Sequence, residues 1–238
     1  HNGIHEYNRE MCVVCGECIQ FCYSNALELT GKKITVDDVL TEILKDKDYY
    51  FSSGGGVTLS GGEPMLHSRF LISLLRKCKE AGIHTAVETS GNCRWTQLEE
   101  ALPITDLIMM DLKQMDSNKH KDVTGVPNDL ILENAGKLSE TNIPIIFRIP
   151  VIPTVNDTKE EIEAIAGFVE KLTNTRKEKF GINSAYIKLE LLQFHRLAGY
   201  KYKSMDLPDR ASGLRDISRT EMTDFKSYAK AFRIDVKE

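Results

Sequence analysis

The chain has 238 residues, of which 41% are hydrophobic and 28% charged, and this composition suits a soluble globular protein with one sizeable core. Its net charge of −4 and isoelectric point near 5.9 give no reason to expect a nucleic-acid or a membrane partner. The sequence contains neither an apolar run long enough to span a bilayer nor a recognisable secretory leader, so we expect a cytoplasmic protein.

Four of the six cysteines lie in one short run near the amino terminus, Cys12-x2-Cys15-x2-Cys18-x3-Cys22. Thiolates at this density suit a [4Fe–4S] cluster, because the corners of the cubane are close together and prefer soft ligands. A structural zinc ion is the alternative, although zinc sites usually take two separated pairs of ligands. Tyr23 replaces the proline that ferredoxins carry here. Cys22 therefore either closes a single cluster or belongs with a second run upstream.

Beyond the cysteine run, the hydrophobic pattern predicts alternating helices and strands. A capped amphipathic helix is expected from Thr35 to about Asp48, after a turn at residues 30–32. Apolar, β-rich runs predict strands at Gly56–Ser60, Ile83–Thr89, Leu107–Leu112, Ile143–Ile149 and Tyr186–Leu192. Helical patterns fall at about 65–81, 128–141, 158–172 and 218–231, and a short last strand is expected at 233–236. Repeated βα units imply a parallel sheet, either open or closed into a barrel.

Each of the five main predicted strands ends in polar residues, although the strands themselves are apolar. These groups are Ser60-Gly61-Gly62-Glu63, Glu88-Thr89-Ser90-Gly91, Asp111-Leu112-Lys113, Arg148-Ile149-Pro150 and Gln193-Phe194-His195. Carboxyl ends of parallel strands carry the active sites of α/β barrels and open sheets. Any one residue has an ordinary alternative role, as a surface ion pair, a helix cap or a partner for a neighbouring carboxylate. Five such strand ends together favour one small-ligand site, and a glycine pair lets the backbone approach a ligand closely.

Several motifs together resemble the activating enzymes of glycyl radical enzymes, the pyruvate formate-lyase-activating branch of the radical S-adenosylmethionine (radical SAM) superfamily. They are VTLSGGEP, GIHTAVETSG, MMDLK, Asp116-x3-His120-x3-Thr124-Gly125, RIPVIPTVND and LLQFHRLAGYKY, which span roughly residues 10–205 with the cysteine run. The resemblance implies an α/β fold, a partial (β/α) TIM-like barrel of the radical SAM type that lacks its first strand. It also implies two parts, a ferredoxin-like iron–sulfur segment over about residues 1–32 and a radical SAM core over 33–238.

The activity implied by this resemblance is the reductive cleavage of S-adenosylmethionine (SAM). A reduced [4Fe–4S] cluster gives one electron to the sulfonium, and the resulting 5′-deoxyadenosyl radical removes a hydrogen from the Cα of a glycine in a partner glycyl radical enzyme. A flavodoxin- or ferredoxin-type protein would supply the electron. The cofactors carry the difficult chemistry, so the expected contribution of the chain is a cofactor cradle rather than a catalytic side chain.

The resemblance also implies a role for individual residues. Contacts to SAM are expected from Gly61, Gly62, Glu63, Asp111, Leu112, Lys113, Arg148 and His195. The glycine pair and Glu63 would bind the amino group, and His195 would lie near the adenosyl end. A monovalent cation beside the cofactor carboxylate is implied at Glu88, Thr89 and Asp111, with Glu88 standing where the best-known relative has an aspartate. Cys12, Cys15, Cys18 and Cys22 match the ferredoxin-type insert of a subset of these enzymes.

One motif of the family does not occur in these 238 residues, the C-x3-C-x2-C loop that binds the catalytic cluster. The run from Cys12 to Cys22 cannot replace it, because its spacing differs. We therefore expect an N-terminally incomplete activating enzyme that does not cleave SAM by itself. Two other functions are compatible with the sequence: another radical SAM enzyme with an auxiliary cluster, or a non-catalytic iron–sulfur module for electron transfer or binding.

Overall fold

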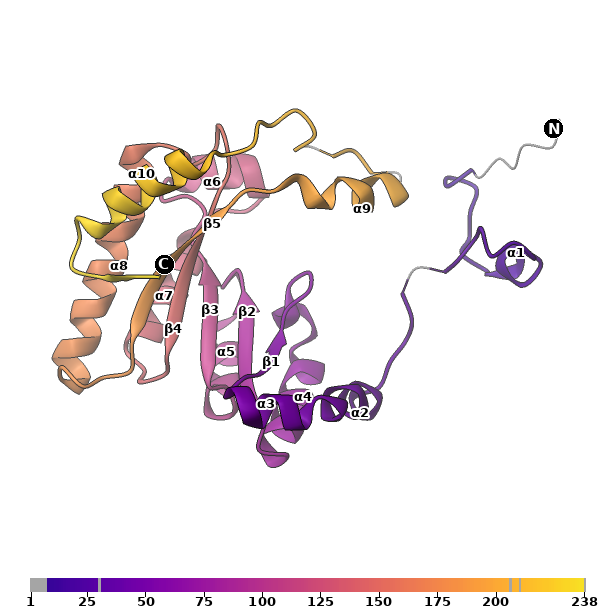
Figure 1. The fold of residues 1–238 in the computed structure, drawn as a ribbon, viewed down its shortest axis with the longest axis horizontal. Helices are drawn as coiled ribbons and strands as arrows, with labels where there is room; N and C mark the ends of the chain where they lie inside the picture. Colours follow the sequence, from indigo (N-terminus) through magenta and orange to yellow (C-terminus); the bar gives the residue numbers. More distant parts are fainter. Residues whose placement is uncertain (1–7, 30, 206, 210, 238) are drawn as a thin grey trace.

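The centre of the protein is a six-stranded parallel sheet (Figure 1). The computed structural model describes residues 8–29, 31–205, 207–209 and 211–237. The strands follow chain order across the sheet: β1 (Gly56–Leu59), β2 (His84–Thr89), β3 (Leu107–Asp111), β4 (Ile145–Val151), β5 (Ile187–Gln193) and β6 (Asp235–Val236). Each neighbouring pair is parallel. The parallel α/β sheet predicted from the sequence is therefore confirmed, and its open arrangement is consistent with a partial barrel.

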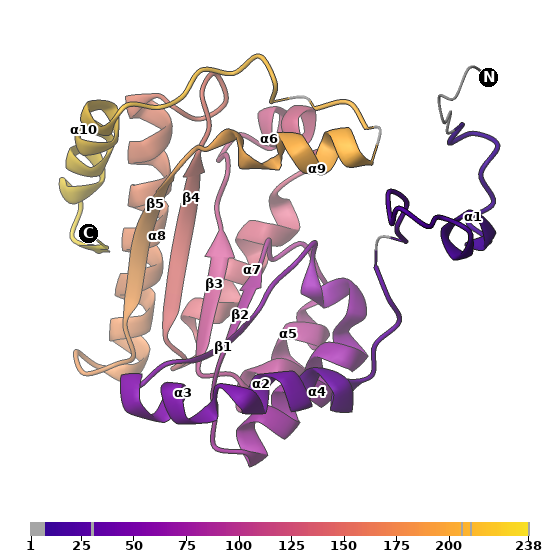
Figure 2. The same cartoon turned by 45° about the vertical axis from the view of Figure 1, so that its right-hand side comes forward.

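Helices and short 3-10 turns connect the strands. The helices are α1 (Glu17–Gln20), α2 (Val36–Lys45), α3 (Lys47–Ser53), α4 (Ser68–Glu80), α5 (Trp95–Ala101), α6 (Ser117–Thr124), α7 (Asp129–Ser139), α8 (Lys159–Phe180), α9 (Gly199–Ser204) and α10 (Arg219–Lys230). The 3-10 turns are η1 (Pro64–His67), η2 (Leu102–Ile104) and η3 (Arg196–Ala198). Figure 2 shows α5, α7 and α8 behind the sheet, which is the arrangement that right-handed βα crossovers produce.

Local sequence signals explain most helix boundaries. Thr35 begins α2 with a capping box, because its hydroxyl accepts from the Asp38 amide at 3.2 Å and the Asp38 carboxylate accepts from the Thr35 amide at 3.0 Å. Thr158 caps α8 by accepting from the Glu161 amide at 3.2 Å. The helix predicted from Thr35 to Asp48 is divided at Asp46, where α2 ends and α3 follows in a new direction.

The core lies between the sheet and the helices behind it. Strand β4 is buried along almost its whole length, which is expected of a central strand in a parallel sheet. Phe147 and Ile149 of β4 are fully buried, as is Val169 of α8. Helix α4 contributes Leu75 and Cys78 to the same core. The strands whose carboxyl ends form one edge of the sheet are therefore held in place by a well-packed core.

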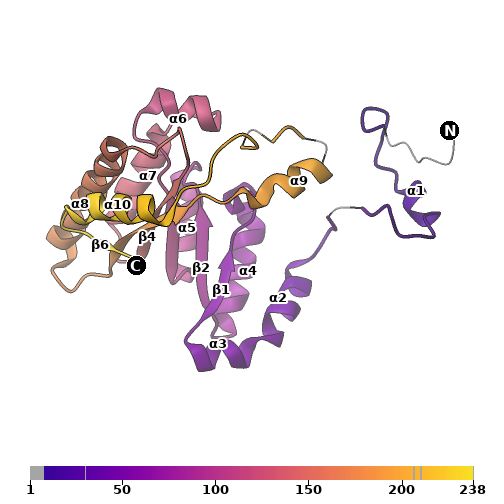
Figure 3. The same cartoon turned by 45° about the horizontal axis from the view of Figure 1, so that its top comes forward.

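Residues 8–29, which include α1 and which we call the cysteine segment, lie apart from the sheet (Figures 1 and 3). Apolar side chains in this segment are strongly exposed, among them Val13 at 84% and Phe21 at 72%. A hydrogen bond from the Arg9 guanidinium to the Ser204 carbonyl, at 3.3 Å, connects the segment to the end of α9. Among the described residues, no helix has the length and apolar character needed to cross a membrane.

Candidate functional site

The Glu63 carboxylate joins the carboxyl ends of β1 and β2. It lies just before η1 and accepts four hydrogen bonds. Its Oε1 accepts from the Thr89 hydroxyl at 2.7 Å and from the Met65 amide at 3.1 Å. Its Oε2 accepts from the Ser90 amide at 2.8 Å and from the Ser90 hydroxyl at 2.6 Å. Sequence patterns predicted that these two strand ends would meet, and the structure brings them into direct contact.

The glycine pair before Glu63 faces open space. Gly61 has a φ of +128°, a conformation that only glycine adopts readily, whereas Gly62 does not have such a positive φ. A Cβ added at either position would meet no atom within 4 Å. The protein itself thus leaves room beside this backbone. A small ligand can approach it closely, as the sequence predicted.

Three neighbouring strands contribute a second group of charged side chains. The register of β3 and β4 places Asp111 opposite Arg148. The guanidinium Nη2 of Arg148 lies 2.9 Å from Asp111 Oδ1 and 2.7 Å from Glu88 Oε1, so a single nitrogen bridges two carboxylates. Burial by itself lowers the pKa of Arg148, but the hydrogen bond to Glu88 and the charge of Asp111 outweigh this effect and raise that pKa. The guanidinium therefore stays positively charged.

The end of β3 is fixed from both sides. The Lys113 ammonium lies 3.0 Å from Asp111 Oδ2, and the Leu112 side chain is buried in the core, so only the backbone of Leu112 faces this edge. Asn156, which is fully buried, donates to the Lys113 carbonyl at 2.8 Å and to the Pro150 carbonyl at 2.9 Å. Asn156 therefore links the loops after β3 and β4. Asn156 belongs to the RIPVIPTVND motif, but the motif by itself does not reveal this role.

His195 is set apart from these groups. It is exposed and directly precedes η3, and among the described residues no hydrogen bond or ion pair joins it to Glu63 or to Arg148. The remaining charged residues of the site are three carboxylates and two cations, with a formal charge of −1. Such a mouth offers acceptors for a cationic group and donors for a carboxylate, which suits a zwitterionic ligand with a net positive charge.

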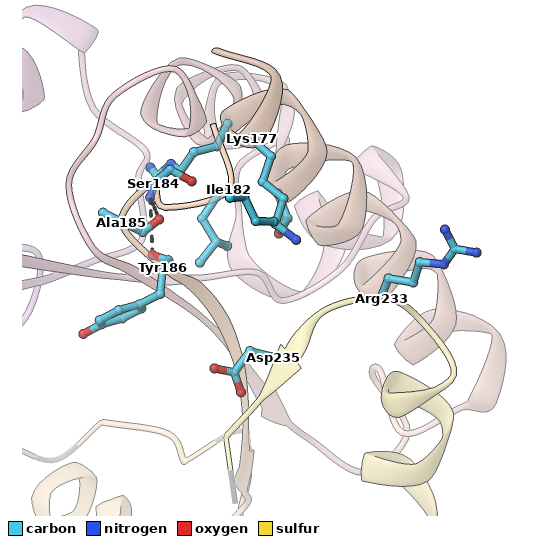
Figure 4. A pocket seen from close by; sticks show the side chains of 10 residues that line it. Lys177, Ile182, Ser184, Ala185, Tyr186, Arg233 and Asp235 are labelled. Atoms are coloured by element: carbon cyan, nitrogen blue, oxygen red, sulfur yellow. Dashed lines mark hydrogen bonds between the residues drawn. The ribbon is translucent and has the colours of Figure 1, made fainter. Parts of the chain in front are cut away.

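A cavity at the opposite end of the sheet has a different character (Figure 4). It measures about 230 Å³, and Lys177, Tyr186 and Asp235 are among its lining residues. The buried Arg176 also lines it, and its guanidinium donates to backbone carbonyls at distances from 2.6 to 3.3 Å. This arginine ties the end of α7 to the chain before β5. We therefore assign its buried charge to the support of the fold and not to ligand binding.

The four cysteines of the cysteine segment are suitable cluster ligands by their chemistry. They are not joined in disulfides, and Cys15 and Cys18 are exposed. A hydrogen bond from Ser24 is the main cause that lowers the pKa of the Cys22 thiol. In the described residues no three His, Cys, Asp or Glu side chains are gathered as a ligand group. The donor set of four thiolates at this spacing fits an iron–sulfur cluster, although the side chains are not preassembled around one centre.

The fold and the strand ends define an α/β protein with a candidate ligand site at the mouth of a parallel sheet, and comparisons with known proteins specify its class. The profile of the radical SAM superfamily matches residues 20–169. The (2S)-3-sulfopropanediol dehydratase activating enzyme of Klebsiella oxytoca is 40% identical over 94% of this chain and 68% of its own length. The isethionate sulfite-lyase activating enzyme of Oleidesulfovibrio alaskensis is 39% identical over 84% of this chain and 61% of its own length.

A solved structure agrees with these relatives. A domain of the pyruvate-formate lyase-activating enzyme from Bacteroides vulgatus is 30% identical, with a TM-score of 0.58, over 77% of this chain and 98% of that domain. The chain therefore belongs to the radical SAM superfamily, in its branch of glycyl radical enzyme activating enzymes. The cofactors of this family are SAM and a [4Fe–4S] cluster. The open glycine backbone and the mixed charges of the strand ends fit SAM, and the four thiolates fit a [4Fe–4S] cluster of the ferredoxin type, which is distinct from the one that the C-x3-C-x2-C loop binds in the family.

Proposed function

We propose that this chain forms the SAM-binding part of an activating enzyme for a glycyl radical enzyme. The observation that carries the proposal is the convergence of the strand ends: the Glu63 carboxylate, the open Gly61–Gly62 backbone and the charged group around Arg148 belong to four adjacent strands. When SAM and a reduced [4Fe–4S] cluster are bound, they supply the one-electron and radical chemistry of the family. The chain's own residues bind and orient the cofactor.

The charge of each side chain supports a particular role in binding the cofactor. Glu63 would attract the amino group of SAM, and the neighbouring glycines would let that group approach the backbone. Arg148 and Lys113 would donate to the cofactor carboxylate, since both already serve carboxylates of the protein. Asp111 and the Leu112 backbone would hold the end of β3 in place. His195 would have to approach from η3 to meet the adenosyl end.

The proposed monovalent cation site at Glu88, Thr89 and Asp111 coincides with the bridge made by Arg148. Because one guanidinium nitrogen already lies between the two carboxylates, a cation would enter only after Arg148 turned toward the cofactor carboxylate. Binding of the cation and of the cofactor would then support each other. Titration of SAM in potassium chloride and in choline chloride at equal ionic strength tests this: tighter binding in potassium chloride is expected, and equal affinities would contradict the cation site.

The ferredoxin-like segment at about residues 1–32, which includes the cysteine segment, would be a separate iron–sulfur part beside the core at 33–238. Its cluster would take electrons from a flavodoxin- or ferredoxin-type donor in the cytoplasm. The protein partner would be a glycyl radical enzyme. The relatives are named for activating different enzymes, a sulfopropanediol dehydratase and an isethionate sulfite-lyase, so they support the class of partner rather than one member.

Anaerobic reconstitution with iron and sulfide tests the proposed cluster. We expect about four irons per chain, and we expect the paired substitutions Cys12→Ser and Cys15→Ser to abolish this binding. The matched control is Cys78→Ser, which changes a buried core cysteine outside the segment. Retention of the iron by the double variant would contradict the assignment of the cluster.

The same preparation tests the expected inactivity of the isolated chain. It lacks the C-x3-C-x2-C motif, so with dithionite and SAM it should release no 5′-deoxyadenosine above a control without protein. Catalytic formation of 5′-deoxyadenosine by this chain alone would show that the cysteine segment suffices for SAM cleavage, and would refute that expectation.

A further inference from the structure

The two hydroxyl groups that bind Glu63 have their protons directed toward it. A hydroxyl has a single proton to donate, and its oxygen can also accept. The Thr89 oxygen accepts from the Gly91 amide at 3.0 Å, and the Ser90 oxygen accepts from the Asn92 amide at 3.3 Å. Since these amides occupy the accepting side of each oxygen, each proton is left for the Glu63 carboxylate.

The loop that carries these groups is anchored from behind. Asn134 of α7 is fully buried, and its side-chain amide donates at 2.8 Å to the carbonyls of both Gly91 and Cys93. Thr89 is also buried, with 3% exposure. Thr89 is therefore part of the core, and the loop that carries Ser90 is held to the core by Asn134 without a ligand.

We propose that Ser90 is a positioning residue that fixes the Glu63 carboxylate for the ammonium group of the cofactor. This inference rests on the proposed function. Ser90 supplies both hydrogen bonds to Oε2, one from its amide and one from its hydroxyl, whereas Oε1 is served by two separate residues. Loss of the Ser90 hydroxyl removes the shorter bond to Oε2 and lets this oxygen turn away. A carboxylate that is oriented before binding pays less ordering entropy when the ligand arrives.

The test compares two ligands, SAM and its analogue without the α-amino group, in wild type and in the Ser90→Ala variant. The ratio of the two affinities reports on the ammonium interaction alone. We expect Ser90→Ala to weaken SAM binding by about tenfold, because hydrogen bonds to charged groups are worth more than neutral ones. Binding of the analogue should change by less than twofold. Ser90→Thr, which keeps a hydroxyl, should restore most of the ratio.

Ser73→Ala is the matched control, since the Ser73 hydroxyl bonds to the Arg69 carbonyl on the exposed side of α4. An equal loss for both ligands in Ser90→Ala would assign Ser90 a merely structural role and overturn the proposal. Unchanged binding of SAM by Ser90→Ala would also overturn the positioning role, and either result, with SAM bound by wild type, would leave the proposed function intact. Failure of wild type to bind SAM would instead overturn the proposed function together with this inference.

Discussion

Replacement of Arg148 by methionine should destabilise the fold by about 2–4 kcal/mol. The Arg148 side chain is only 10% exposed, and it is the shared partner of Glu88 and Asp111 at 2.7 and 2.9 Å. Removing one partner of a buried ion pair costs about 3–5 kcal/mol, because a charge is left without compensation. Glu88 is 35% exposed, so water screens part of its lost interaction, and the expected cost lies below the full range. Methionine keeps the apolar stem and so isolates the loss of charge.

Urea unfolding followed by circular dichroism measures this effect, with the m-value as a check that the unfolded state is unchanged. The double variant Glu88→Gln with Arg148→Met removes one of the two carboxylates left unpaired, and it should recover about 1 kcal/mol relative to Arg148→Met alone. A loss below about 0.5 kcal/mol for Arg148→Met would refute the view that this bridge holds the strand ends together. So would a double variant whose loss equals the sum of the two single losses.

Three further predictions concern the support of the site. Burial would raise the pKa of Asp106, but the ion pair with Lys79 outweighs burial and lowers that pKa. Asp106→Asn should therefore cost about 1–2 kcal/mol at pH 7 in urea unfolding. The difference should begin to shrink as the pH falls below about 4 and should vanish only when Asp106 is protonated in the folded state as well. Burial raises the pKa of Cys93 to about 11. At pH 8, mass spectrometry should therefore detect alkylation of the exposed Cys18 by iodoacetamide at a rate about a hundredfold higher than alkylation of Cys93. Burial lowers the pKa of Arg176 to about 10, which leaves it charged at neutral pH, and Arg176→Met should lose about 3–5 kcal/mol by unpairing backbone carbonyls.

Each of these three predictions can be contradicted by a specific result. A cost of Asp106→Asn that did not shrink at all between pH 7 and the acid end of the folded range would mean that charge is not its cause. Equal labelling rates for the two cysteines would show that the loop after β2 opens freely. An Arg176→Met variant as stable as wild type would mean that water satisfies the carbonyls that the guanidinium binds.

The sequence predicts the sheet well, because its strands are long apolar runs with polar ends. Three helices between strands were missed: α5, α6 and the six-residue α9. Helix α5 is only seven residues long, and α6 buries only His120, so neither has an apolar stripe long enough to stand out. The helix predicted from the sequence ends at about residue 172, whereas α8 continues to Phe180 and therefore includes Arg176. Its burial depends on carbonyls far away in the chain, which local patterns do not contain.

For the candidate site too, the sequence predicts the location of the residues but not their contacts. Polar residues at successive strand ends predict that Glu63, Asp111 and Arg148 share one edge, since parallel strands align their carboxyl ends. They do not predict which pairs form. The choice of Glu88 as a partner for Arg148, and of Ser90 as a donor to Glu63, depends on the twist of the sheet and on side-chain rotamers. Only the three-dimensional structure shows which side chains pair.

If the open backbone at the end of β1 receives SAM, a side chain added at Gly62 should block the cofactor, and the Gly62→Val variant tests this. A Cβ at Gly62 meets no atom within 4 Å, so the variant should fold with wild-type stability, as should the control Gly213→Val at another open position. By equilibrium dialysis, wild type and Gly213→Val should bind SAM with equal affinity, while Gly62→Val should lose at least about tenfold. Unchanged SAM binding by a stable Gly62→Val variant would show that SAM does not bind beside this backbone.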